Sequence, residues 1–265
     1  MKSHTTSIFL VLVFLPLCLS TSTAQSETTI TLTYENVDSF PWSMKDGSGI
    51  DLILLKMVDE AMPNVSFKYV QAPWKRCLNN IGTGTTEGCF TASFKEKRLQ
   101  FGFYPGTHIG NAVDPNLMLH ASSYSLYILK DSTINVPEKM KISGLNGKIA
   151  APAGYSIGGD LQSAGYSVDA SASKTTNNFE KLLLNRVKAV AALTLNGNNI
   201  LVKHKKYADS IKVVTTPLVN KPYYLMFSKQ FIKKDRALAE SIWSKAAEIR
   251  EGQEFKDKAG EFLSK

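Results

Sequence analysis

The feature that most constrains the fold is an alternation of strand-like and helix-like segments. Segments Thr29–Tyr34 and Val65–Tyr69 alternate as strands do, and they flank Ile50–Met62, whose apolar residues follow helical spacing. A short helical stripe that begins at Trp74 and an apolar segment at Gly88–Ser93 continue the order. This β-α-β-α-β order predicts a mainly parallel sheet covered by helices.

The same alternation restarts in the second half of the chain. Two segments that read as extended, Tyr124–Leu129 and Leu218–Tyr224, border this second block. If both cross between the blocks, the chain leaves the first domain, builds the second and returns. We therefore expect two α/β lobes with a hinge and a ligand cleft between them, lobe 1 comprising 25–121 and 220–265 and lobe 2 comprising 122–219.

The N-terminal segment 1–24 is predicted to be a secretory signal peptide. Lys2 gives it a basic start, Ile8–Leu19 is apolar but too short to span a bilayer, and small residues lead to a cleavage site after Ala24. A lipoprotein signal at Cys18 is the alternative, but Leu17 stands where a small residue belongs. The mature chain is thus expected to be exported to the periplasm.

Cleavage would leave two cysteines, Cys77 and Cys89. An even pair in an oxidising compartment predicts a disulfide, and two buried thiols are the alternative. The absence of a CxxC pair or a neighbouring histidine in the sequence argues against a metal-binding or catalytic role.

The basic charge is scattered along the chain. The formal net charge is +8, and the basic runs Lys203–Lys206 and Lys233–Lys234 fall at expected helix edges. We interpret them as solvated faces, so nucleic acid is not an expected partner. A mild positive field would still help to collect anionic ligands.

A candidate anion site follows the strand at Gly88–Ser93. Thr91 and Ser93 supply hydroxyl groups and Arg98 supplies a planar fork of N–H donors that fits a carboxylate. No nucleophile, base or metal cluster accompanies them, which favours holding a small anion over transforming one. A surface turn rich in Lys and Arg is the alternative.

One motif points to an enzyme. Gly154–Gly158 fits G-x-S-x-G and lies between a predicted strand and a predicted helix, as a nucleophile elbow requires. A triad also needs an acid and then a histidine downstream, and the sequence offers only His204, in a basic run. A hydrolase is therefore kept only as an alternative.

Five stretches, in this order and spacing, resemble motifs of the family 3 extracellular solute-binding proteins, the amino-acid-binding class of periplasmic receptors. They are Phe40–Ser43, Gly47–Leu52, Pro73-Trp74 with Gly82 and Gly88, Ser93–Arg98 closing at Tyr104-Pro105, and Leu145–Ser156. The resemblance implies a two-lobe, type II periplasmic-binding-protein-like fold with two crossover strands as its hinge. It also implies a monomer without a cofactor, whose partners are a small-molecule ligand and either the membrane subunits of an ABC importer or a membrane sensor.

The resemblance also implies roles for individual residues. Arg98 would bind a ligand carboxylate, with contacts from Thr91 and Ser93. Tyr155 and Ser156 would stand at a helix N-terminus, where free N–H groups favour an anion. Two tryptophans, Trp42 and Trp74, would wall the cleft, with ordinary core packing as the alternative. An arginine kept for a ligand is expected to have no fixed partner inside the protein.

One departure from the family pattern bears on the ligand. Receptors of this class usually carry an acid in the second lobe that pairs with the ligand ammonium, but Leu193 stands near that position and Lys188 stands where an acid usually follows the helix. Glu35, after the first strand, could substitute from the other lobe. The ligand is therefore not expected to be restricted to standard α-amino acids.

The predicted function is capture of a small polar, carboxylate-bearing solute by hinge closure and its delivery to an ABC importer, without catalysis. The alternatives are a ligand sensor without transport and a secreted enzyme on the same scaffold, either an esterase or a relative of cyclohexadienyl dehydratases. The sequence shows no clear acid–base pair for the latter.

Overall fold

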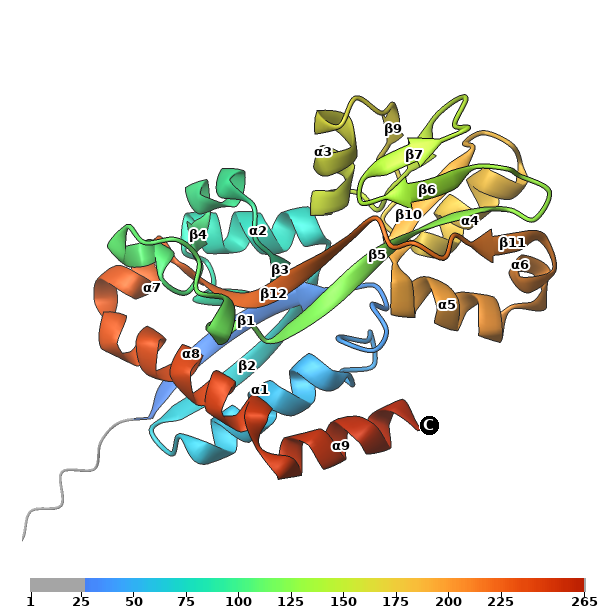
Figure 1. The fold of residues 1–265 in the computed structure, drawn as a ribbon. Coiled ribbons are helices and arrows are strands. Elements are labelled where there is room, and N and C mark those ends of the chain that lie inside the picture. Colours follow the sequence, from blue (N-terminus) through green and yellow to red (C-terminus); the bar gives the residue numbers. More distant parts are fainter. Residues whose placement is uncertain (1–26, 265) are drawn as a thin grey trace, which may run out of the picture.

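The computed structural model describes residues 27–264 and shows two lobes joined by two strands (Figure 1). The predicted signal peptide, residues 1–24 with Cys18, lies outside the described residues. Within residues 27–264, no helix combines the length and the apolar character needed to cross a membrane.

Lobe 1 is built on three parallel strands, β1 (Thr28–Glu35), β2 (Val65–Ala72) and β3 (Gly88–Ser93), with β1 in the middle. Its other elements are α1 (Ile50–Ala61), α2 (Trp74–Thr83), η1 (Glu96–Gln100), β4 (Gly102–Phe103), η2 (Thr107–Ile109), η3 (Pro115–Leu117), and, from the C-terminal part of the chain, α7 (Lys229–Lys234), α8 (Arg236–Glu251) and α9 (Gln253–Leu263). The predicted β-α-β-α-β order is confirmed.

The apolar spacing in α1 explains how this helix covers the sheet. Ile50, Leu54, Leu55 and Val58 are buried, which places the apolar stripe of α1 against the core of lobe 1. Helix α8 packs on the same core through Trp243, whose indole Nε1 donates a hydrogen bond to the Leu225 carbonyl at 2.8 Å. The C-terminal helices therefore complete lobe 1 rather than lobe 2 (Figure 1).

Lobe 2 is smaller and more irregular. Its elements are β6 (Asn135–Glu138), β7 (Lys141–Ser143), β8 (Ile149–Ala150), α3 (Ser156–Ser163), β9 (Val168–Asp169), α4 (Thr175–Leu183), β10 (Ala189–Leu193), α5 (Thr194–Lys203), α6 (Lys205–Ser210) and β11 (Ile211–Val213). Every residue of β10 is buried, and it runs parallel to β8. A continuous apolar strand is typical of a sheet covered on both faces.

Two long strands, β5 (His120–Leu129) and β12 (Val219–Ser228), pair antiparallel with each other and run between the lobes. Because β12 also pairs with β3 and β5 also pairs with β10, they join both lobes in one sheet of order β2-β1-β3-β12-β5-β10-β8-β9. The predicted crossover strands are thus confirmed. The lobe boundaries at residues 122 and 219 stay a prediction, because they fall at or inside these two strands.

The two cysteines are separate thiols, so the predicted disulfide is not formed in this structure. Both are buried in an apolar cluster around α2 and β3, and the Cys77 thiol donates to the Ala72 carbonyl at 3.3 Å. Burial raises the pKa of Cys77 to about 12, and burial raises that of Cys89 as well. The structure therefore agrees with the alternative of two buried thiols, which pack in the core as small apolar side chains.

Candidate functional site

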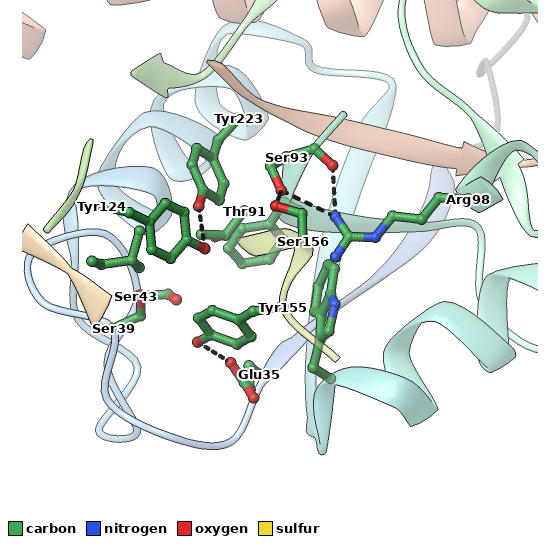
Figure 2. Close-up of a pocket in the computed structure, with 13 residues that line it drawn as sticks. Glu35, Ser39, Ser43, Thr91, Ser93, Arg98, Tyr124, Tyr155, Ser156 and Tyr223 are labelled. Atoms are coloured by element: carbon green, nitrogen blue, oxygen red, sulfur yellow. Dashed lines mark hydrogen bonds between the residues drawn. The ribbon is translucent and has the colours of Figure 1, made fainter. Parts of the chain in front are cut away.

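A cavity lies between the lobes, next to the crossover strands (Figure 2). The space between its walls is about 360 Å³ when its opening to solvent is included, but the cavity volume itself is only about 20 Å³, room for about one water molecule in this arrangement of the lobes. Both lobes and both crossover strands contribute to its wall. The lining residues are Glu35, Ser39, Ser43, Trp74, Phe90, Thr91, Ser93, Arg98, Tyr124, Tyr155, Ser156, Leu193 and Tyr223.

Arg98 lines this cavity from η1, directly after β3, and its residue is only 6% exposed. Its Nη1 donates to the Ser93 carbonyl at 2.6 Å and contacts the Ser93 hydroxyl at 3.2 Å. Its Nη2 donates to the Gly154 carbonyl of lobe 2 at 3.1 Å, and the guanidinium lies 5.1 Å from the centre of the Trp74 ring. The expectation of no fixed internal partner is therefore wrong.

Glu35 lines the cavity from the end of β1 and is also 6% exposed. Its Oε2 accepts a hydrogen bond from the Tyr155 hydroxyl at 2.5 Å, while its buried Oε1 has no partner within residues 27–264. Burial raises the pKa of Glu35 to about 7, although the Tyr155 hydrogen bond and the charge of Arg98 oppose the shift. A buried carboxylate oxygen with no partner is costly, so a donor from a ligand would stabilise it.

Tyr155 and Ser156 stand at the N-terminal end of α3, as predicted. Ser156 Oγ lies 2.8 Å from Ser93 Oγ and 2.9 Å from Lys221 Nζ, so it contacts both lobe 1 and a crossover strand. Gly154, which precedes Tyr155, has φ +80°, and a Cβ there would approach side-chain atoms of Trp74 and Lys75 at 3.2 Å. Glycine adopts this φ without strain, and its lack of a Cβ leaves room for the close approach of the lobes.

Thr91 lines the cavity, but its hydroxyl is used by the protein. It donates to Asp51 Oδ2 at 2.8 Å, and Asp51 Oδ1 lies 2.7 Å from Nδ1 of His120. The backbone of Thr91 has φ +57°, an uncommon conformation for a β-branched residue. The hydroxyl is thus directed toward Asp51, which leaves other atoms of Thr91 to face the cavity.

The two predicted tryptophans differ. Trp74 lines the cavity and also packs in the apolar cluster with Cys77, so the interpretation as wall and the interpretation as core both hold. Trp42 is not among the lining residues. It stacks on His120 with ring centres 3.6 Å apart, and its indole Nε1 donates to Ser122 Oγ at 3.3 Å. The prediction of Trp42 as a cleft wall is corrected, because its ring is occupied by this stack.

Several residues that line the cavity were not predicted from the sequence. Tyr124 and Tyr223 come from the crossover strands, and their hydroxyl groups are hydrogen-bonded at 2.8 Å (Figure 2). Ser39 and Ser43 come from the loop after β1, and Phe90 comes from β3. The available signal was positional, because side chains on strands that cross a hinge border the cleft beside it.

Leu193, at the end of β10, lines the cavity where an acid was expected. The lobe 2 residues among the lining, Tyr155, Ser156 and Leu193, carry no carboxylate. Glu35 is the carboxylate that lines the cavity, and it comes from lobe 1. Leu193, which stands where the acid of lobe 2 was expected, and Glu35, its candidate substitute from lobe 1, therefore line the same cavity.

The enzyme alternatives gain little from the geometry. The hydroxyl of Ser156 contacts Ser93 and Lys221 and no histidine within residues 27–264, and His204 lines a different pocket. In the same part of the chain, no three His, Cys, Asp or Glu side chains are grouped so that they could hold a metal ion.

No family model matches the chain, and no curated protein matches it. Solved structures do match. A mutant of ArgBP from T. maritima covers 89% of this chain and 96% of its own, with 16% identity and a TM-score of 0.69. A histidine kinase sensor domain with similarity to periplasmic binding proteins covers 89% and 96%, with 14% identity and a TM-score of 0.68.

A third similar structure is the GluR0 ligand-binding core from Nostoc punctiforme in complex with L-glutamate. It covers 86% of this chain and 98% of its own, with 13% identity and a TM-score of 0.64. At these identities the comparisons concern the fold. The chain has the two-lobe fold of type II periplasmic binding proteins, the fold that its resemblance to the family 3 solute-binding proteins implies.

Proposed function

We propose that this protein is a periplasmic receptor that captures a small polar solute bearing a carboxylate and closes its two lobes on it. The observation that carries this proposal is the pair of opposite groups in one cavity. Arg98 and Glu35 are both buried in the cavity wall, and both come from lobe 1. A cation and an acid in one interlobe cavity suit a small ligand that has both an acidic and a donor group.

Arg98 binds the ligand carboxylate in this proposal. Ser93 and Ser156 add contacts from their hydroxyl groups, and Thr91, whose hydroxyl is bonded to Asp51, adds a backbone contact. Glu35 binds an ammonium or another donor group, taking the role of the acid that lobe 2 lacks near Leu193. Trp74 and Tyr155 form apolar walls. Trp42 contributes indirectly, because it supports His120 and the crossover strand behind the cavity.

Closure of the lobes is supported by contacts that cross the cleft. Arg98 reaches the Gly154 carbonyl, Ser93 reaches Ser156, and Tyr155 reaches Glu35. Each contact joins lobe 1 to the segment that begins α3. A ligand that binds these groups more tightly in the closed arrangement than in the open one would shift the equilibrium toward the closed arrangement. Hinge-closing receptors respond to binding in this way.

Delivery to the membrane subunits of an ABC importer is the proposed consequence of closure, with the protein acting as a monomer. Sensing without transport is the second candidate, favoured by the similarity to a histidine kinase sensor domain. Both use the same binding step.

Native mass spectrometry of the protein purified from a periplasmic extract tests the binding step. We expect a retained small molecule with a carboxylate, and calorimetry with that compound should give one site per chain. The variant Arg98→Lys should bind it much more weakly. A retained compound without any acidic group, bound equally well by both proteins, would contradict the proposal.

A further inference from the structure

A short segment of lobe 2, just before α3, contacts both charged groups of the cavity. The carbonyl of Gly154 accepts a hydrogen bond from Arg98 Nη2 at 3.1 Å, and the Tyr155 hydroxyl donates to Glu35 Oε2 at 2.5 Å. In the proposed function, Arg98 and Glu35 bind the carboxylate and the donor group of the solute. Lobe 2 therefore already provides a partner for each of these two groups.

Tyr155 also takes up space that a solute would need. Figure 2 shows its ring among the other lining residues, with the hydroxyl directed at Glu35. With this ring in place, the cavity volume is about 20 Å³, room for about one water molecule. A molecule with a carboxylate and a donor group is much larger than one water. It cannot lie between Arg98 and Glu35 while Tyr155 keeps this position.

The Tyr155 hydroxyl is a suitable donor for a buried acid. Burial raises the pKa of Tyr155 well above its ordinary value, and the nearby Glu35 raises it further, so the phenol keeps its proton. The hydrogen bond in turn lowers the pKa of Glu35, against the larger rise caused by burial. The phenol thus stabilises the carboxylate form of Glu35, as a donor group of a solute would.

The protein's own groups satisfy the cavity only in part. Three lining residues of lobe 1 each have a buried polar side-chain atom without a partner in the described part of the chain, namely Glu35 Oε1, Ser39 Oγ and Trp74 Nε1. Buried polar atoms without partners are costly. A solute that pairs with these atoms gains contacts that Tyr155 does not make, so it can replace Tyr155 at Glu35.

We propose that Tyr155 is an internal competitor of the solute, whose ring and hydroxyl occupy the place of the solute's donor group beside Glu35 and must be displaced for binding. This inference rests on the proposed function and names a residue that sets the affinity of its site. The displaced ring still borders the enlarged site as an apolar wall. The observed affinity is then the intrinsic affinity multiplied by the fraction of molecules in which Tyr155 has left Glu35.

Two other roles of the Tyr155 hydroxyl predict a change of the opposite sign. If the hydroxyl contacts the bound solute, its removal weakens binding. If its bond to Glu35 holds the lobes closed around the solute, its removal also weakens binding, because closure becomes less favourable. For an internal competitor, the bond exists only before the solute binds. Its removal therefore strengthens binding.

A salt bridge between the lobes provides a contrast to this bond. Asp160 on α3 pairs with Lys95, which follows β3 in lobe 1, and with Lys221 on the crossover strand β12. None of these three residues is among those that line the cavity. A solute does not need to displace this salt bridge, so it can stabilise closure with the solute in place. Asp160→Asn should therefore weaken binding or leave it unchanged.

Native mass spectrometry with a dilution series of the small-molecule fraction of a periplasmic extract provides the test, because it compares proteins without the identity of the solute. Each protein is first freed of retained molecules, and its native mass spectrum verifies this. We expect Tyr155→Phe to reach half occupancy at about fivefold greater dilution than wild type, because one competing hydrogen bond is lost. Tyr155→Leu, which also lacks the hydroxyl, should shift in the same direction.

Tyr166→Phe is the matched control, because the hydroxyl of Tyr166 makes its contacts within lobe 2, with the Ile142 amide and the Met140 carbonyl. It should reach half occupancy at the same dilution as wild type.

One result would overturn the inference and leave the proposed function intact, namely a carboxylate compound that Tyr155→Phe binds no better than wild type does. If neither the wild type nor any variant retains a carboxylate compound, the proposed function fails, and the inference fails with it. Melting temperatures verify that each variant is folded, and Tyr155→Leu retains the test if Tyr155→Phe does not fold.

Discussion

The two lobes contribute differently to the cavity. Lobe 1 supplies the charged side chains, Glu35 from the end of β1 and Arg98 from η1. Lobe 2 supplies uncharged ones, Tyr155, Ser156 and Leu193. Lobe 1 is thus suited to fix the charged groups of a ligand, and lobe 2 is suited to close over them.

The contacts across the cleft show how this difference operates. Tyr155 of lobe 2 donates its hydroxyl hydrogen to the lobe 1 carboxylate, and Gly154 of lobe 2 offers its carbonyl to the lobe 1 guanidinium. Both charged groups of lobe 1 are therefore solvated by neutral groups of lobe 2. These contacts replace water around both charges with fixed dipoles, so their strength depends on the state of each charge.

The largest expected effect comes from Arg98→Lys, which removes the planar fork of lobe 1. We expect the affinity for the retained solute to fall by ~2–5 kcal/mol, because lysine cannot reproduce a bidentate contact. The unfolding free energy should also fall, by roughly 1–3 kcal/mol, because the bonds to Ser93 and Gly154 are lost. Calorimetry and denaturant unfolding measure both quantities.

Arg76→Lys, on the exposed face of α2, is the control for Arg98→Lys and should change neither quantity. Unchanged affinity in Arg98→Lys would show that the carboxylate binds elsewhere. Lost stability with unchanged affinity would make Arg98 a structural bridge between the lobes.

The second prediction concerns the acid of lobe 1. Because the folded protein raises the pKa of Glu35 from 4.5 to about 7, it binds this proton more tightly than the unfolded chain does. The contribution of Glu35 is therefore most favourable at low pH, and stability is lost as the pH rises from 4.5 to about 7. At 1.36 kcal/mol per pKa unit, the loss is roughly 3 kcal/mol.

Glu35→Gln should lack this pH dependence, so its unfolding free energy relative to wild type should increase between these two pH values. Denaturant unfolding at several pH values measures the difference. Glu60→Gln, on the exposed side of α1, is the control. A difference that stays constant with pH would mean that the Glu35 carboxyl titrates normally in the folded protein.

A smaller effect is expected from Tyr155→Phe, which removes the hydroxyl that lobe 2 offers to Glu35. The loss of one hydrogen bond should cost about 1 kcal/mol. Since this bond opposes the upward shift, its removal should raise the pKa of Glu35 further and move the pH profile of the previous test upward. Tyr166→Phe, a tyrosine of lobe 2 whose hydroxyl contacts Met140, is the control. An unmoved profile would contradict the cross-lobe bond.

The smallest expected signal is hydrolysis at Ser156. Its hydroxyl has Ser93 and Lys221 as neighbours. Burial lowers the pKa of Lys221, but the salt bridge to Asp160 opposes this shift and favours the ammonium form, which cannot accept the proton of Ser156. We expect no burst of product when the protein is mixed with p-nitrophenyl acetate. A burst equal to the protein concentration that disappears in Ser156→Ala would instead support the esterase alternative.

The sequence predicted lobe 1 better than lobe 2. In lobe 1 the strands and α1 have clear periodicity, and their buried residues match it. In lobe 2, β8 and β9 have two residues each, and α5 begins directly after the last residue of β10. Such short strands carry too few residues for a period to show, and their existence depends on pairing with distant segments.

The candidate site shows the same contrast. Arg98, Ser93, Thr91, Trp74, Tyr155, Ser156 and Glu35 were predicted and all line the cavity. Trp42 was predicted and does not, and the cysteines were predicted to bond and do not. Sequence motifs identify the segments of the chain that border a cleft. They do not determine the direction in which a side chain turns.

The sequence by itself determined the α/β alternation, the crossover strands and the arginine after β3, because these depend on local periodicity and residue type. Only the tertiary structure decided that Glu35 faces the cavity with one oxygen unpaired, that Tyr124 and Tyr223 join it, and that Asp160 lies between Lys95 and Lys221. These features depend on how closely the lobes approach and on which groups lose water. The approach of the lobes and the loss of water both depend on contacts between segments far apart in the chain, and a local sequence pattern cannot predict such contacts.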